Sequence, residues 1–473
     1  MKNLYMRIGK VGGSILLMLT LLNSGLVWGQ GPPSGTAPSE AQEGAVPEKP
    51  KEKPEEKPPL ELVIPTKPLA PPPTTTFEVG PATGILAPYS YAPGTDILDR
   101  GWQSHKVGIL RVFPYLDYTC VYRTNIFQTT TNKKADLVNT GNPGLRLELP
   151  LAQRHKISVA YLGNYYWYSY FQHSNHYDHT FNVDGSFVFP AGLSLRLGQS
   201  AKWATEDRSA VVARAREYTR IDPYFQASYK FADRWKFDFN YQLDMLGFLK
   251  TQDQVSNTQD HAWGATLYYK LFPKTAALLQ YILTYRKHPY NQTSDNISHT
   301  PLLGLTWDPT AKLSGTIKFG YTYQNYFNPP VGNRSVARSF TMTVQTLYRY
   351  SRYTNLSLVL QRANLEDPDT ANSGFTNTGA YLSLNHQWTY LNIMSTIFIN
   401  YYNNSYLNDT QDSVTGQFRK REDNVINTGV GLMRPITKWL KARLDYNYFN
   451  KGCNMSNINF NEHRVMFGIQ SSF

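Results

Sequence analysis

Apolar and polar residues alternate with a period of two from about residue 105 to the C-terminus. In the segment 235–245, WKFDFNYQLDM, every odd position is apolar and every even position is polar. A strand places successive side chains on opposite faces, whereas an amphipathic helix repeats every 3.6 residues, so the pattern predicts half-buried β-strands. Similar runs occur at residues 145–149, 181–189, 193–197, 313–323, 440–448 and 465–473.

The connections between these runs are of two alternating kinds. Short turns rich in Pro, Asp, Gly or Lys lie near residues 150–155, 190–192, 232–234, 273–275, 308–312, 351–354, 389–391 and 435–438. Longer polar loops lie near residues 119–136, 172–177, 205–215, 250–258, 288–297, 328–336, 365–375, 408–421 and 451–459. Eight turns and nine loops join eighteen strands. In bacterial outer-membrane barrels the short turns face the periplasm and the long loops face outward.

Composition supports strands that face lipid on one side and water on the other. The chain has 34 Tyr, 23 Phe and 9 Trp, yet its mean hydropathy is −0.45 and only 17% of its residues are charged. Soluble domains carry roughly 25% charged residues. Tryptophans are expected to form two girdles, one beside the short turns and one toward the long loops (Trp235, Trp307, Trp388 and Trp439; Trp167, Trp203 and Trp263).

An open sheet edge in hydrocarbon would leave backbone groups without hydrogen bonds. We therefore predict an all-β fold, a single closed antiparallel transmembrane β-barrel of about 18 strands, with an aqueous lumen. One soluble β-sandwich, or several in tandem, is the alternative. Strands of about 10 to 14 residues, longer than the usual five or six, argue against it.

The N-terminal region is predicted to direct export. Lys2, Arg7 and Lys10 precede the apolar run 15–22, and the sequence is typical of a signal peptide over residues 1–29. A retained anchor helix is the alternative. The prediction places the mature protein in the outer membrane of a Gram-negative-type bacterium.

A Pro/Glu/Lys-rich segment follows at residues 30–76 and has too few apolar residues to form a core. We predict a disordered periplasmic linker there, a periplasmic lead-in segment over residues 77–104 and the barrel over residues 105–473. The linker is either an inert spacer or a docking tail for a periplasmic export protein or the cell wall.

The charge balance points to anionic partners. The chain has 47 Lys and Arg against 35 Asp and Glu, a net charge of +12. Among the residues that alternate with the apolar ones, and that would therefore face the lumen, fifteen are basic and five are acidic. We predict an anion-favouring lumen, unless many of these residues pair with carboxylates or lie at the periplasmic rim. The main lumen-lining candidates are Arg146, Arg196, Lys202, Arg220, Lys318, Arg349, Arg362, Arg443 and Arg464.

Catalytic signals are weak. The spacing His173, His176 and His179 would allow a metal site, but neighbouring Asn and Tyr favour a hydrated loop. No phosphate-binding loop, CxxC pair or zinc-protease motif is found in the sequence. We predict no enzyme, and no catalytic residues, cofactor, metal or nucleic-acid partner.

The two cysteines are far apart in sequence, at Cys120 and Cys453. Closure of the barrel would bring the first and last strands together, so we expect both cysteines at the outer face near the seam. A disulfide between them is therefore a hypothesis, with two free thiols as the alternative.

One local stretch resembles a known family. The residues are 122–127 (YRTNIF), Asp136, 143–145 (PGL) and 175–179 (NHYDH). They resemble the beta-barrel porin family associated with exopolysaccharide export, and the terminal Phe473 looks like the signal that barrel-assembly machinery reads. The resemblance implies an outer-membrane conduit for a secreted polysaccharide.

The first functional hypothesis is a passive channel for an exported, anionic polysaccharide or for small anions. A general or solute-specific uptake porin is the second, and a non-conducting adhesin or structural barrel is the third. The expected partners are outer-membrane lipid, the assembly machinery at Phe473 and a periplasmic export protein.

Overall fold

The computed structural model describes residues 105–152, 154–207, 214–308, 312–329, 332, 334–366, 374–412 and 414–472. The predicted signal peptide, linker and lead-in segment lie outside these ranges. Within them, no helix is long and apolar enough to cross a membrane. Among the described residues, the helical elements are three short 3-10 turns: η2 (Gln172–Ser174), η3 (Thr251–Ser256) and η4 (Gln292–Ser294).

Eighteen long antiparallel strands form the barrel, preceded by the short strand β1 (His105–Val107). The barrel strands are β2 (Leu110–Arg123), β3 (Asp136–Leu151), β4 (His155–Tyr168), β5 (His176–Val188), β6 (Leu193–Glu206), β7 (Arg216–Phe231), β8 (Trp235–Phe248), β9 (Thr258–Phe272), β10 (Thr275–Lys287), β11 (Asn296–Trp307), β12 (Leu313–Tyr326), β13 (Val336–Arg349), β14 (Thr354–Leu365), β15 (Phe375–Trp388), β16 (Ile393–Gln411), β17 (Phe418–Pro435), β18 (Leu440–Cys453) and β19 (Phe460–Ser472).

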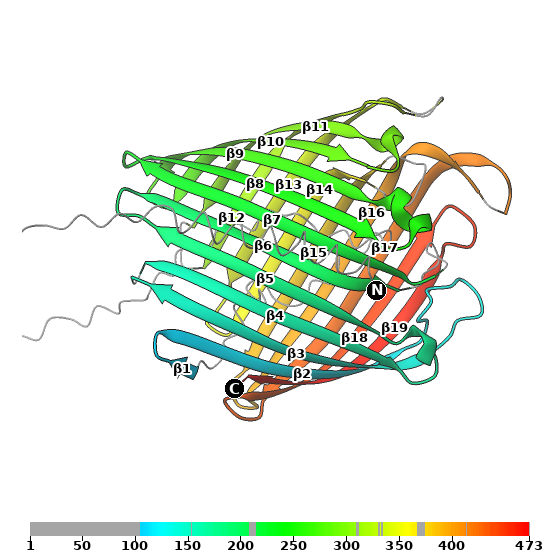
Figure 1. The fold of residues 1–473 in the computed structure, drawn as a ribbon, viewed down its shortest axis with the longest axis horizontal. Helices are drawn as coiled ribbons and strands as arrows, with labels where there is room; N and C mark the ends of the chain where they lie inside the picture. The colour runs from blue at the N-terminus through cyan, green and yellow to red at the C-terminus, as the bar shows by residue number, and fades with distance from the viewer. Residues whose placement is uncertain are drawn as a thin grey trace, which may run out of the picture. The chain divides into compact units, whose positions relative to one another are not determined.

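Each strand from β2 to β19 pairs with its sequence neighbours, and β19 pairs with β2 to close the cylinder. Figure 1 shows the strands running side by side around the wall at a common tilt. Closure satisfies the backbone groups that an open edge would expose to lipid. The predicted all-β barrel of about 18 strands is confirmed, with β1 as an added hairpin arm on β2.

Connection lengths follow the predicted alternation. At one end, the short-turn end, the connections range from two residues (273–274) to five (308–312). At the other, the long-loop end, they range from six residues (412–417) to twelve (124–135). Both β2 and β19 have their free ends at the short-turn end (Figure 1). By the rule for bacterial outer-membrane barrels, this end faces the periplasm.

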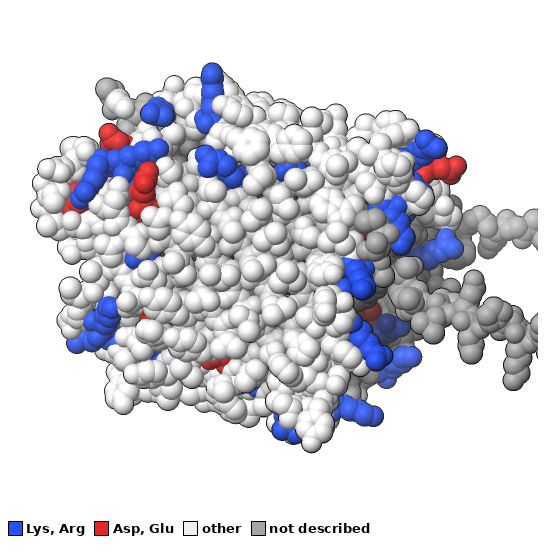
Figure 2. Space-filling view, turned by 180° about the vertical axis from the view of Figure 1, so that it is seen from behind, with Lys and Arg blue, Asp and Glu red and all other residues white. Residues whose placement is uncertain are grey.

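The outward face of the wall is apolar. Along β12 and β18, for example, Phe319, Tyr321, Leu444 and Tyr446 are exposed, and the residues between them point inward. A broad band without charged side chains crosses the face shown in Figure 2. This is the surface that hydrocarbon would cover.

Tyr–His pairs add a polar belt to this outward face. In four places a tyrosine hydroxyl lies 2.6 to 2.9 Å from the Nδ1 atom of a histidine on the next strand: Tyr161–His179, Tyr241–His261, Tyr281–His299 and Tyr446–His463. The tryptophans lie at the two ends of the strands as predicted. Amphipathic rings of these kinds suit the headgroup level of a membrane.

The proposed disulfide is wrong, because both cysteines are free. Cys120 lies within β2 and pairs with Phe467 of β19, which in turn pairs with Leu444 of β18. Cys453 is nine positions further along β18, which corresponds to about 30 Å at about 3.4 Å per residue. The prediction placed both thiols at the same rim and ignored the stagger between neighbouring strands that barrel closure requires.

Candidate functional site in the barrel lumen

Eight of the nine lumen-lining candidates lie on inward-facing positions. Most of them are sequence neighbours of an exposed apolar residue, so their own side chains point to the opposite, inward face. Arg146, for example, follows Leu145, and Lys318 precedes Phe319. The eight are Arg146, Arg196, Lys202, Arg220, Lys318, Arg349, Arg443 and Arg464.

Arg362 is the exception, and the prediction for it is wrong. It pairs with Thr378 across β14 and β15, on the same face as Leu358 and the exposed Leu382. Its Nη1 atom donates a hydrogen bond of 2.7 Å to the Thr378 hydroxyl. The apolar residues at 356, 358 and 360 already mark this parity in the sequence, so Arg362 should have been assigned outward.

Inward arginines on β5 to β10 form ion pairs with carboxylates of neighbouring strands. Arg196 Nε lies 2.8 Å from Asp184 Oδ2, Arg220 Nε lies 2.9 Å from Asp244 Oδ1, and Arg286 Nε lies 2.6 Å from Asp260 Oδ1. Such charge-assisted contacts are the strong class of hydrogen bond. They neutralise most of the cationic charge that the sequence predicts for this part of the wall.

The seam between the first and last strands is built in the same way. Glu462 accepts hydrogen bonds from Arg123 and Arg464, each at 2.6 Å. On β17 and β18, Asp423 Oδ2 lies 2.7 Å from Arg421 and 3.1 Å from Lys451. These carboxylates share the inward parity of the predicted bases but were missed, as were Asp184, Glu206 and Asp260. The same alternation would have found them.

The opposite part of the wall, β11 to β16, is almost uncharged. We call it the amide wall. Within the described residues of these six strands, no inward position carries a carboxylate, and the inward cations are Lys318 and, at the short-turn end, Arg349. Its polar side chains are Asn296, Ser298, Thr300, Thr306, Ser314, Thr316, Thr322, Gln324, Ser339, Thr341, Thr343, Gln345, Asn355, Ser357, Gln361, Asn377, Ser383, Asn385, Thr396, Asn400, Asn404 and Asn408.

Hydrogen bonds order the amide wall across its strands. The hydroxyl of Thr322 lies 3.0 Å from that of Thr300 and 2.6 Å from that of Thr341. Asn377 Nδ2 donates to Asn404 Oδ1 at 2.7 Å. Hydroxyls and amides each have more donor and acceptor positions than these contacts use. The wall is therefore a polar, internally hydrogen-bonded surface, in which side chains such as Asn377 and Asn404 are almost fully buried.

Lys318 lies where the charged and uncharged parts meet. Its Nζ atom donates a hydrogen bond of 3.1 Å to Gln280 Oε1 on β10. Among the described residues, no carboxylate forms an ion pair with it. It is thus a cation that no described carboxylate compensates, on a wall whose other inward strand cation, Arg349, lies at the short-turn end.

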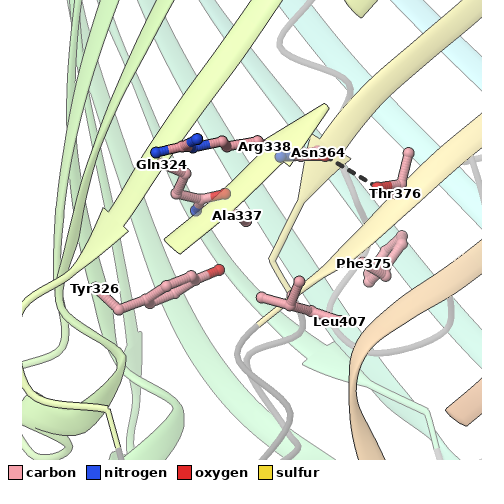
Figure 3. A pocket seen from close by; sticks show the side chains of 9 residues that line it. Gln324, Tyr326, Ala337, Arg338, Asn364, Phe375, Thr376 and Leu407 are labelled. Carbon is pink, nitrogen blue, oxygen red and sulfur yellow. Dashed lines mark hydrogen bonds between the residues drawn. The ribbon is translucent and has the colours of Figure 1, made fainter. Parts of the chain in front are cut away.

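The long-loop end is narrowed by residues that fold inward. Ile126, in the loop between β2 and β3, packs against Val138 and Tyr168, which face the lumen. Figure 3 shows a small cavity of about 30 Å³ near this end, room for one water. It lies within the wall, because Gln324 and Tyr326 in its lining have the inward parity whereas Arg338 and Thr376 have the outward parity.

Glu366, just after β14, also reaches across the inner wall. It accepts hydrogen bonds from Tyr326 at 3.0 Å and Asn296 at 3.2 Å, and it contacts Gln324. Burial raises the pKa of Glu366 to about 7, although the nearby Arg286 lowers it. The carboxyl therefore titrates near neutral pH.

Metal binding at His173, His176 and His179 finds no support in the geometry. His173 lies in η2, His176 stacks on Tyr166, and His179 bonds to Tyr161 on the outward face. In the described part of the chain, no group of three or more His, Cys, Asp or Glu is arranged to hold a metal ion.

The geometry defines a class of protein: a closed 18-stranded β-barrel with an apolar exterior and a polar interior, as in outer-membrane porins. The chain belongs to the family described as "Putative beta-barrel porin 2", whose model matches residues 103–473. Among curated proteins, no match is found.

Several solved structures are similar to this chain. OccK2 (OpdF) of Pseudomonas aeruginosa has 11% identity and a TM-score of 0.45, covering 78% of this chain and 100% of that one. OccAB3 of Acinetobacter baumannii has 10% identity and a TM-score of 0.42, with 76% and 99% covered. The FrpB iron transporter of Neisseria meningitidis has 8% identity and a TM-score of 0.43, with 76% and 81% covered.

Proposed function

We propose that this porin is a passive channel that carries a secreted exopolysaccharide outward across the outer membrane. The amide wall is the observation that supports this proposal. A saccharide presents hydroxyls at regular intervals, and six adjacent strands carry inward-facing amides and hydroxyls, the groups that can hydrogen-bond to them. Many weak, equivalent contacts admit a chain without trapping it, which conduction requires.

The ion pairs on the charged part of the wall also suit passage. A paired arginine such as Arg220 offers little net charge to a moving solute, so a polymer does not stall on it. Anion preference in the lumen then rests on few residues, with Lys318 the clearest. In this proposal the protein is a channel rather than an enzyme.

We also propose partners for the channel. Outer-membrane lipid surrounds the apolar band, and the terminal residue Phe473 of the sequence addresses the barrel-assembly machinery. The Pro-rich segment 30–76 links the channel to a periplasmic export protein or to the cell wall.

Planar-bilayer recordings with maltodextrin oligomers test the channel. We expect steady conductance with brief, concentration-dependent blocks. Asn400→Ala removes an inward amide and should shorten the blocks about five-fold, the value of roughly one hydrogen bond. Asn403→Ala, on the outward face of the same strand, is the matched control and should leave them unchanged. Absence of conductance would contradict the proposal.

A second candidate is an uptake porin for small polar solutes. The inward packing of Ile126 favours it, because a narrowed outer mouth suits a small solute better than a polymer. Deleting the gene separates the two: loss of surface polysaccharide supports export, whereas unchanged polysaccharide with slower solute uptake supports the second candidate.

A further inference from the structure

The net positive charge of the barrel is gathered at the short-turn end. We call the basic residues in and beside the short turns the collar. Among the described residues of this end, the carboxylates are few: Glu148, Asp233, Asp238 and Asp308. The collar consists of Arg154, Lys156, Lys230, Arg234, Lys236, Lys270, Lys274, Lys312, Arg349, Arg352, Lys438 and Lys441.

Figure 2 shows this asymmetry, with Lys and Arg dominating one end of the face and mixed with Asp and Glu at the other. At the long-loop end, several described cations lie beside carboxylates: Arg214 bonds to Asp253 at 2.5 Å, and Arg421 to Asp423 at 2.7 Å. The two mouths of the barrel therefore differ in net charge.

Part of the collar points into the mouth. Lys230 on β7 and Lys236 on β8 are direct cross-strand partners. Both lie on the inward parity, since Tyr229 and Phe237 beside them are exposed on the outer face. Lys270 on β9 shares that parity.

Like charges directly opposite each other destabilise a sheet. Asp238 Oδ2 compensates Lys236 at 2.7 Å, but among the described residues no carboxylate forms an ion pair with Lys230 or Lys270. Lys230 and Lys270 therefore carry positive charge that no described carboxylate compensates, so an anion from outside is the fitting partner.

Two other possible partners of the collar fit less well than a solute in the mouth. Anionic lipid headgroups would meet the outward side of the rim, whereas Lys230, Lys236 and Lys270 face the aqueous mouth. The chain's own Pro-rich segment 30–76 carries seven Glu and five Lys, so its net charge is only −2.

We propose that the collar is the entrance for a polyanionic chain, so that the transported polymer is an acidic polysaccharide with repeated carboxylates that enters from the short-turn end. This inference rests on the proposed function. Clustered cations at a mouth raise the local concentration of an anionic chain and its rate of entry. Beyond the collar, ion pairs and the amide wall replace net charge, so the captured chain is released into the lumen rather than held.

Single-channel recordings with oligogalacturonate, an acidic oligosaccharide, and maltodextrin of equal length test the inference. We expect oligogalacturonate to block from one side at a rate at least about ten-fold above that of maltodextrin, falling steeply with salt. The triple variant Lys230→Gln, Lys236→Gln, Lys270→Gln should remove most of this difference. The matched control Lys133→Gln, Lys134→Gln, Lys250→Gln at the long-loop end should leave it in place.

The outcomes separate the two proposals. Equal block rates for the acidic and neutral oligomers from both sides would overturn the acidic-polymer inference while leaving the channel intact. A difference that the long-loop control removes and the collar variant preserves would also overturn it. If maltodextrin fails to enter at all, the proposed function fails instead.

Discussion

Arg220 on β7 donates a hydrogen bond from Nε to Oδ1 of Asp244 on β8 at 2.9 Å, and its Nη2 contacts the second carboxylate oxygen. Asp222 lies 3.4 Å from the same guanidinium. The arginine therefore contributes to a network with two carboxylates rather than a free positive charge. Its pairing shows why a count of lumen cations overstates the anion preference of the wall.

Substitution of either partner should shift ion selectivity in opposite directions. We expect Arg220→Gln to favour cations and Asp244→Asn to favour anions, each by roughly two-fold, since a unit charge acts on an ion about 8 Å away in water with about 0.5 kcal/mol. The double variant should return close to wild type. Reversal potentials in a KCl gradient measure this. Equal shifts of the same sign in both single variants would refute the pairing.

Lys318 should also control anion passage. Lys318→Gln removes the uncompensated cation of the amide wall, and we expect the chloride-to-potassium permeability ratio to fall about two-fold. Arg362→Gln is the control, because Arg362 faces outward and should leave the ratio unchanged. An effect of Arg362→Gln equal to that of Lys318→Gln would contradict the assigned faces.

The two cysteines should behave as free thiols. Alkylation of the unfolded protein without reductant should add two carbamidomethyl groups by mass spectrometry. Reductant should change neither the mass gain nor the electrophoretic mobility. A protein that takes up label only after reduction would show that a bridge forms after all.

Selectivity should also depend on pH through Glu366. Its pKa of about 7 lies above the ordinary value for glutamate, so the folded state holds this proton more tightly than the unfolded state. Raising the pH from 5 to 8 therefore removes stability at this site and adds a negative charge to the long-loop mouth.

We expect the anion-to-cation permeability ratio to fall by roughly two-fold between pH 6 and pH 8 because of this charge. Glu366→Gln should flatten that step, so the difference between the two proteins isolates the carboxyl. A step of the same size in the variant would assign the titration to another group.

The alternation of residues predicted the barrel because one physical constraint acts on every strand: lipid outside and water inside. The lengths of the connections then predicted the number of strands and distinguished the two ends of the barrel. The connection 273–274, for example, is short, whereas 124–135 is long. The same alternation assigned eight of nine lumen candidates correctly. The prediction for Arg362 was wrong because the outward parity of the leucines at 356, 358 and 360 continues to the end of β14.

Other features depend on the register between strands, which a single sequence does not specify. The distance from Cys120 to Cys453 follows from the stagger of β2, β19 and β18. The pairing of Arg286 with Asp260 and the reach of Glu366 to Asn296 likewise depend on which residues stand opposite one another. These contacts decide the net charge of the wall, so the predicted cationic lumen needed correction.

Thiol accessibility along β8 tests the barrel most directly. Single cysteines are placed in turn at positions 236 to 244 of a variant that lacks Cys120 and Cys453, and the protein in lipid vesicles is treated with a charged, membrane-impermeant thiol reagent. We expect labelling at 236, 238, 240, 242 and 244 and protection at 237, 239, 241 and 243. Labelling without alternation, or on the odd positions, would contradict a lipid-embedded cylinder with a water-filled interior.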